Sequence, residues 1–182
     1  MSRIPLALTC LLLTALLLLS CTGDKTPPPP AMDVLTAMQA AMTDTAQTLP
    51  DGLTYSRAVD PSSPHYLTDT LFSALYGEAA RGLLEADGGD GTAPPISDAA
   101  LFLSIAPYPC ELAVFRCSDT RSAATVAGLC RTRQDTLHRG WADTEWAAVT
   151  GRAAVAVEGS YVLLAVADDP ETVLAGARRA IG

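Results

Sequence analysis

The segment Arg152–Ala167, with the sequence RAAVAVEGSYVLLAVA, decides the fold of this chain. Both of its halves are rich in valine and alternate in places, as residues of β-strands do. Gly159-Ser160 between the halves is typical of a tight hairpin turn. The segment therefore predicts two antiparallel strands, Arg152–Glu158 and Tyr161–Ala167.

The residues that follow the hairpin predict a helix. Asp169 is a natural N-cap, Pro170 suits the first helical position, and Glu171 complements the helix dipole. Four apolar residues then recur at helical spacing, and we expect them to face inward: Val173, Leu174, Ala177 and Ile181.

A longer helix is predicted before the hairpin, with Ser118 or Asp119 as its cap. One stripe of residues recurs every three or four positions and is expected to face the core: Ala123, Val126, Ala127, Cys130, Gln134, Leu137 and Trp141. The place of Cys130 in this stripe favours a buried thiol. The charged residues fall mostly outside this stripe and are expected on a solvated face: Arg131, Arg133, Asp135 and Arg139.

Two further strands, Ala99–Ile105 and Glu111–Cys117, are predicted upstream, joined by a turn at residues 106–109. The second strand is apolar on both sides, so we expect it to be covered on both sides at least in part. The order strand, strand, helix, strand, strand, helix predicts an α+β fold. We expect a mostly antiparallel sheet of about four strands, with the helices on one face.

The part before the sheet, residues 32–96, is expected to add helices to a single α+β domain that spans 32–182, with 97–182 as its sheet-containing core. Apolar residues at helical spacing predict one helix over Ala31–Thr48 and a shorter one over Leu67–Leu75. Between them, Leu53–Pro64 is predicted to be irregular. Asp87–Gly91 lacks the alternating ligands and the closing carboxylate of a calcium loop, so a flexible acidic loop is expected.

The start of the chain resembles a bacterial lipoprotein signal peptide. Arg3 precedes an apolar run that is shorter than the roughly 20 residues of a membrane span, and the run ends in Ser20-Cys21. This resemblance implies a signal peptide over 1–20, lipid attachment at Cys21, and a proline-rich tether over 21–31. The protein would then lie at the extracytoplasmic face of the cell membrane, held by its lipid. The alternatives are an uncleaved signal anchor and a secretory signal with an incidental cysteine.

Charge and cysteine content limit the partners and cofactors. The formal net charge of −8 argues against nucleic acid and anionic lipid headgroups as partners. Beyond Cys21 the chain has an odd number of cysteines, Cys110, Cys117 and Cys130. We interpret them as buried free thiols, or as one disulfide with one cysteine left over. No Cys-x-x-Cys occurs and the two histidines are far apart in the chain, so no metal and no cofactor are expected.

Four short segments of the chain, taken with their order and spacing, resemble those of clostridial-type bacterial lipoproteins. These lipoproteins carry an uncharacterised C-terminal domain, which is classed as a domain-of-unknown-function family. The resemblance runs from about Leu67 to the end of the chain, and the segment from Trp141 to Trp146 departs from it. It implies the location and the fold without an activity. The matching pieces are Leu75-Tyr76-Gly77, Glu111-Leu112-Ala113-Val114-Phe115, Gly159-Ser160-Tyr161-Val162-Leu163-Leu164 and Asp168-Asp169-Pro170.

With no catalytic constellation in the sequence, we expect a non-enzymatic binding or interaction module at the cell envelope. Its partner would be an envelope protein or a small ligand. One alternative is a subunit of an envelope assembly that uses a sheet edge or the surface around Trp141 and Trp146.

The other alternative is an enzyme with a pocket near Cys110 and Glu111. In that hypothesis Glu111 forms a polar pocket with Arg116 or Arg133. Cys110 would be a thiol nucleophile, and such a nucleophile needs a base close to it in the fold. The two candidate bases are His65 and His138.

Overall fold

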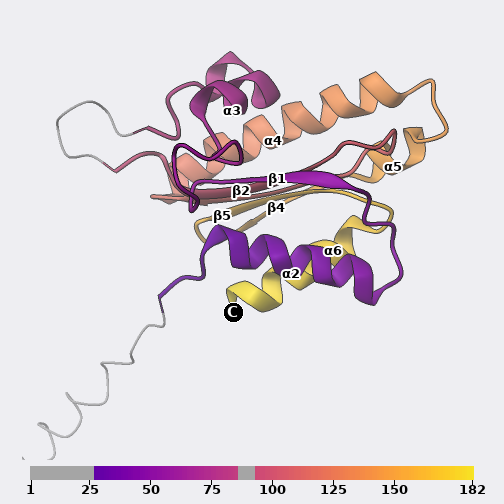
Figure 1. Ribbon diagram of the computed structural model, residues 1–182, viewed down its shortest axis with the longest axis horizontal. Coiled ribbons are helices and arrows are strands. Elements are labelled where there is room, and N and C mark those ends of the chain that lie inside the picture. Colours follow the sequence, from indigo (N-terminus) through magenta and orange to yellow (C-terminus); the bar gives the residue numbers. More distant parts are fainter. Residues whose placement is uncertain (1–26, 86–92) are drawn as a thin grey trace, which may run out of the picture.

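The computed structural model describes residues 27–85 and 93–182. A sheet lies between two layers of helices (Figure 1). The helical elements are α2 (Ala31–Asp44), α3 (Asp69–Tyr76), the 3-10 turn η1 (Glu78–Ala80), α4 (Thr120–Trp141), α5 (Ala147–Arg152) and α6 (Pro170–Ile181). The strands are β1 (Gly52–Ser56), β2 (Ile96–Ser104), β3 (Glu111–Cys117), β4 (Ala154–Glu158) and β5 (Tyr161–Val166). The predicted signal peptide, Cys21 and the acidic loop at 87–91 lie outside the described residues.

The five strands are all antiparallel, in the order β1-β2-β3-β5-β4. The predicted hairpin is present as β4 and β5, with Glu158 opposite Tyr161. The α+β class is confirmed, although the described sheet has one strand more than expected. The additional strand, β1, lies in a segment predicted to be irregular. It is a short edge strand, and Leu53 on it is 39% exposed, so its apolar pattern is weak.

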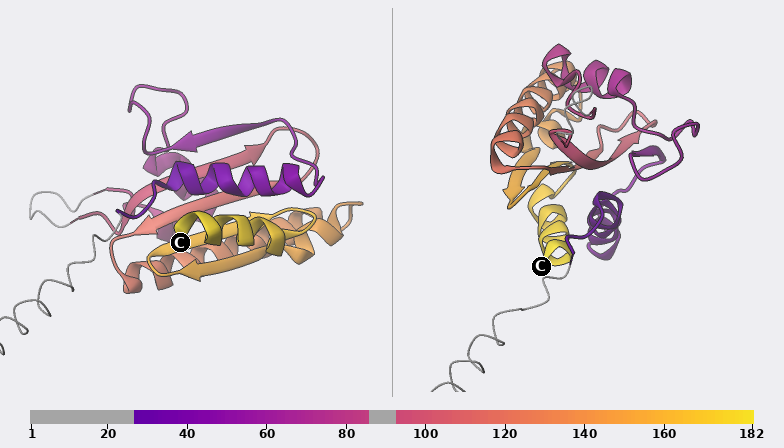
Figure 2. Two further views of the ribbon diagram at one scale, coloured as in Figure 1. Left: turned by 90° about the horizontal axis from the view of Figure 1, so that it is seen from below. Right: turned by 90° about the vertical axis from the view of Figure 1, so that its left-hand side faces the viewer.

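The prediction that the helices share one face is wrong. α2 and α6 lie side by side under one face, while α3 and α4 cover the other (Figures 1 and 2). The reason is the apolar character of the central strands. Every residue of β5 is buried, and so is every residue of β3 except Arg116, which confirms the expected double cover of that strand. Strands that are apolar on both sides must be covered on both sides.

The predicted caps of the two long C-terminal helices are confirmed. The carboxylate of Asp119 accepts a hydrogen bond from Ser122 N–H at 2.7 Å, and α4 begins at Thr120, directly after this cap. Asp169 likewise accepts from Thr172 N–H at 3.2 Å, and Pro170 occupies the first turn of α6. These caps satisfy backbone donors that a helix start leaves unpaired.

The chain enters the domain at the end of the sheet where β3 finishes. Arg116 Nη1 donates to Pro28 O at 3.3 Å, and the Tyr161 hydroxyl donates to Pro29 O. At the start of α2, Ala31 N–H donates to the buried carboxylate of Asp98 at 2.8 Å. The last residues of the predicted tether are therefore fixed against β2, β3 and β5.

Candidate functional site

Glu111 is the centre of a buried polar cluster, which consists of Glu111, Arg133 and Tyr76. It is the first residue of β3 and follows the β2–β3 turn directly. In the register it lies between Leu103 on β2 and Val166 on β5, and its side chain faces α4. Only 4% of this side chain is exposed, so the carboxylate requires partners within the protein.

Arg133 and Tyr76 supply those partners. The guanidinium of Arg133, from α4, donates to Glu111 Oε2 through Nε at 3.0 Å and through Nη2 at 2.8 Å. The hydroxyl of Tyr76, the last residue of α3, donates to Glu111 Oε1 at 2.9 Å. Of the two arginines expected near Glu111, the structure places Arg133 there, while Arg116 lies at the other end of β3.

The protonation of this cluster follows from its burial. Desolvation raises the pKa of the Tyr76 phenol well above its ordinary value, and the charge of Glu111 raises it further. Burial alone would lower the pKa of Arg133, but the charge of Glu111 and the hydrogen bonds to it give a net rise. Tyr76 therefore stays a hydrogen-bond donor, and Arg133 stays a cation.

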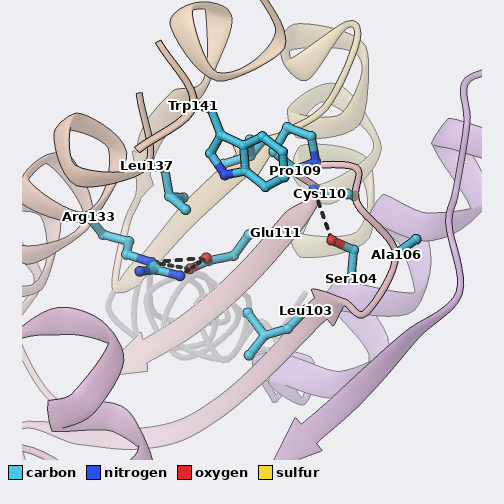
Figure 3. A pocket seen from close by; sticks show the side chains of 10 residues that line it. Leu103, Ser104, Ala106, Pro109, Cys110, Glu111, Arg133, Leu137 and Trp141 are labelled. Atoms are coloured by element: carbon cyan, nitrogen blue, oxygen red, sulfur yellow. Dashed lines mark hydrogen bonds and ion pairs between the residues drawn. The ribbon is translucent and has the colours of Figure 1, made fainter. Parts of the chain in front are cut away.

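A pocket of about 240 Å³ lies beside this cluster, between α4 and the end of the sheet at the β2–β3 turn (Figure 3). The Arg133–Glu111 pair lies on one side of it and Ser104 on the other, while the indole of Trp141 lies above Leu103. The complete lining is Leu103, Ser104, Ala106, Pro109, Cys110, Glu111, Arg133, Leu137, Trp141 and Val166.

A second pocket, also of about 240 Å³, lies between α3 and α4. Tyr76 and Gly77 line it from α3 and its C-cap, and Thr132 and Thr136 line it from α4. Arg133 contributes to both pockets. Its sequence spacing predicted a place for Arg133 mainly on a solvated face. Its side chain is in fact only 17% exposed, because the carboxylate of Glu111 draws it inward.

The structure does not support Cys110 as a nucleophile. Burial raises the pKa of its thiol to about 12, and the charges of Glu111 and Asp168 raise it further. The thiolate is therefore scarce at neutral pH. Within the described residues neither histidine bonds to Cys110: His65 Nδ1 is 3.1 Å from Thr54 O, and His138 Nδ1 is 3.3 Å from a threonine hydroxyl.

The other two cysteines resemble Cys110 in burial. Cys110, Cys117 and Cys130 all have free thiols and are buried, as the first of the two interpretations predicts. Burial raises the pKa of Cys117 to about 11 and that of Cys130 well above its ordinary value. Among the described residues, no group of three or more His, Cys, Asp or Glu side chains is arranged to hold a metal ion.

The two tryptophans have different surroundings. Trp141 lines the first pocket and is partly buried. Trp146 packs edge-on against Tyr108, with 4.8 Å between the ring centroids. An assembly surface that uses both of them stays a prediction.

The sequence did not predict Tyr76 as a site residue. A tyrosine before a helix-ending glycine gives no indication that its hydroxyl donates to a buried carboxylate. Arg133 had a usable signal, because it follows Cys130 by three positions and precedes Leu137 by four, which places it beside the buried stripe.

No family model, curated protein or solved structure matches the chain. Over residues 27–85 and 93–182, no helix is both long and apolar enough to span a bilayer.

Proposed function

We propose that this protein is a lipid-anchored lipoprotein of the cell envelope, whose domain is a non-enzymatic binding module outside the cytoplasmic membrane. The apolar leader that ends in Ser20-Cys21 supports the anchor, with Cys21 as the lipidated residue. The resemblance to clostridial-type lipoproteins supports the same location. The membrane is contacted through the lipid, and the domain is left to bind an envelope protein or a small ligand.

The observation that carries this proposal is the position of the pocket relative to the tether. At one end of β3, Pro28 bonds to Arg116, and Pro29 bonds to Tyr161 on the neighbouring strand β5. The pocket lies at the other end of β3, around Glu111. Five residue steps along the strand separate these ends by about 17 Å. A domain anchored through its N-terminus would therefore present this pocket away from the anchored end.

The chemistry of the pocket favours binding over catalysis. The protons of Tyr76 and Arg133 are held by hydrogen bonds to Glu111, and burial suppresses ionisation of Cys110. A general acid or base must instead exchange its proton near the working pH. A fixed guanidinium beside apolar walls is suited to orient a ligand.

The anchor is tested by intact mass and membrane fractionation of the wild type beside Cys21→Ala. We expect a diacylglyceryl mass shift and membrane location for the wild type, and an unprocessed Cys21→Ala protein. Cys10→Ala, which removes the other cysteine of the leader, is the matched control and should behave as wild type. A wild type without the mass shift would refute the anchor.

A second candidate function, a subunit of an envelope assembly, is favoured by the exposed corner of β1 and β2. Ile105 is 66% exposed and Leu53 is 39% exposed, and Ile105 N–H bonds to Asp51 O beside β1. Both are apolar and lie at the same end of the sheet as the pocket. If this corner joins a partner, Ile105→Asp should abolish a cross-linked species that the wild type forms in membranes. An unchanged cross-linking pattern would contradict this function.

A further inference from the structure

The two edges of the described sheet differ in how their backbone groups are bonded. β1 forms one edge and β4 forms the other, at the lower margin of the sheet in the left view of Figure 2. The outward groups of β1 are occupied, because Ser56 N–H donates to His65 O at 3.0 Å and Ser56 O accepts from Leu67 N–H at 3.1 Å. Thr54 O also lies 3.1 Å from His65 Nδ1. A loop therefore covers this edge.

The outward groups of β4 have no such cover. Backbone groups of successive residues bond to opposite sides of a strand. Ser160 O accepts a hydrogen bond from β3 at 2.8 Å, so the next residue, Tyr161, bonds toward β4, where its partner is Glu158. By the same alternation, the N–H and C=O groups of Val155 and Val157 point away from β5. No loop or helix of the described structure bonds to them.

β4 has few of the features that keep edge strands from pairing. Such features include lysine, proline, bulges and inward-pointing charges. The sequence of β4 is AVAVE, and its one charged residue, Glu158, is bound by Arg178 of α6 at 2.6 Å. The register with β5 contains no bulge, and Val157 is 45% exposed. The edge can therefore accept a further strand through its backbone and its apolar side chains.

The charges beside this edge are complementary to those of a second copy. α6 lies over β4 and β5, with Glu171 in its first turn and Arg178 in its last. Both side chains lie on the flank toward β4, because Arg178 bonds to Glu158 and its Nη1 lies 3.7 Å from Glu171 Oε2. Two copies of α6 that run antiparallel would bring Glu171 of each beside Arg178 of the other. The pairing of unlike charges favours a second copy of this chain as the partner.

The unbonded groups also determine the register of this pairing. Ala153 O, at the same edge, is already bound by the side chain of Gln134. The pairing that uses every outward group of Val155 and Val157 places each of them opposite the other residue in the second copy. Four hydrogen bonds then join the strands, and Ala156 lies on the two-fold axis. The Cα atoms of a non-hydrogen-bonded pair lie about 4.5 Å apart, and the small side chain of Ala156 allows this approach.

We propose that two copies of this chain associate through antiparallel β4 strands, about a two-fold axis at Ala156, and join their sheets into one. The axis is normal to the sheet at this edge, so the α2–α6 layers of both copies lie on the same side. Each α2 begins at Ala31, directly after the tether. Both chains therefore enter on that side, and one membrane can hold both of the proposed lipid anchors.

Cysteine cross-linking of the full-length protein in membranes tests the contact and its register. Ala156→Cys should give a disulfide-linked dimer on mild oxidation, because the expected Cα separation lies within the range of disulfides. Ala154→Cys is the matched control, with the same residue type, strand face and degree of burial. Its counterpart would lie about 14 Å away along the strand, so it should give no more dimer than the wild type. No dimer from Ala156→Cys, or equal yields from both variants, would overturn the proposal.

A backbone variant separates association from folding. Val157→Pro removes an N–H that no described residue uses, so the Tm should stay close to that of the wild type. It should lower the dimer yield of Ala156→Cys at least tenfold, because a bond to the partner is lost at each end of the contact. Val157→Thr keeps the N–H and the branched shape, and should leave the yield unchanged. A folded proline variant that still cross-links fully would refute the strand pairing.

Light scattering of the full-length protein in detergent gives a measurement that needs no cysteine. With the detergent contribution subtracted, we expect the mass of two chains for the wild type and for Val157→Thr. Val157→Pro should have the mass of one chain. A wild type with the mass of one chain at micromolar concentration would contradict the association.

Discussion

Removal of Arg133 alone should destabilise the fold far more than removal of the whole polar cluster. In Arg133→Met the carboxylate of Glu111, whose side chain is 4% exposed, loses both donors of the guanidinium and keeps only the Tyr76 hydroxyl. Breaking a buried ion pair at one partner costs about 3–5 kcal/mol, because it leaves a buried charge without compensation. We expect a loss within this range in the free energy of unfolding.

The triple variant Glu111→Leu, Arg133→Met, Tyr76→Phe tests the cause of that loss. It replaces the cluster by apolar side chains of similar size, and such replacements are often neutral or stabilising. Its free energy of unfolding should lie within about 1.5 kcal/mol of the wild type. Both variants are measured by urea unfolding at one pH.

Two results would refute this reasoning. A loss below about 1 kcal/mol in Arg133→Met would mean that the pair behaves as a solvent-exposed one. A triple variant as unstable as the single one would mean that the lost packing of Arg133, and not the unpaired charge, determines the effect.

Three further predictions concern other residues. Burial raises the pKa of Cys110 to about 12, so its thiolate at pH 7.5 is about a thousandfold scarcer than that of an ordinary thiol; alkylation by iodoacetamide, followed by mass spectrometry, should be correspondingly slow, and fast labelling of folded protein would contradict this. A Cβ at Gly176 would lie 2.7 Å from Ala41 Cβ and 2.9 Å from the backbone of α2, so Gly176→Ala should destabilise the fold by about 1–3 kcal/mol. Gly128→Ala is its control, because that helical position is open, and the change should stabilise by up to about 1 kcal/mol; equal effects would contradict the steric argument. Asp98→Ala leaves the first N–H of α2 without its buried acceptor and should cost about 1–3 kcal/mol in urea unfolding, whereas a change below about 0.5 kcal/mol would show that this contact contributes little.

Local signals in the sequence were sufficient to predict those elements whose structure is determined by residues close together in the chain. The β4–β5 hairpin depends on a two-residue turn, and the caps at Asp119 and Asp169 depend on the next three residues. β1 depends instead on pairing with β2, about fifty residues later in the chain. The loop that follows β1 bonds to its outer edge, because Ser56 N–H donates to His65 O at 3.0 Å. A single sequence carries little sign of such distant pairing.

The two-sided arrangement of the helices was within reach of the sequence. The residues of β3 alternate between faces, and those on both faces are apolar, which requires a helical layer on each side. The same alternation bears on the choice of arginine. Glu111 and Arg116 lie five positions apart in one strand, and an odd separation places two side chains on opposite faces. Periodicity alone could therefore have excluded Arg116 as the partner of Glu111, although the sequence-based hypothesis kept both arginines.

The polar cluster contributes less to the fold than to the pocket. An apolar trio of the same shape would fill the space between α3, α4 and β3 without a desolvation cost, so stability alone gives little reason for a buried ion pair there. The cluster does supply Arg133 Nη1, a fixed donor that makes no hydrogen bond to any described residue. Glu111 fixes the guanidinium through Nε and Nη2, so Nη1 lies on the edge that faces away from the carboxylate. The triple variant should therefore keep the fold while it removes the guanidinium from the pocket lining, and this separates the two contributions of the cluster.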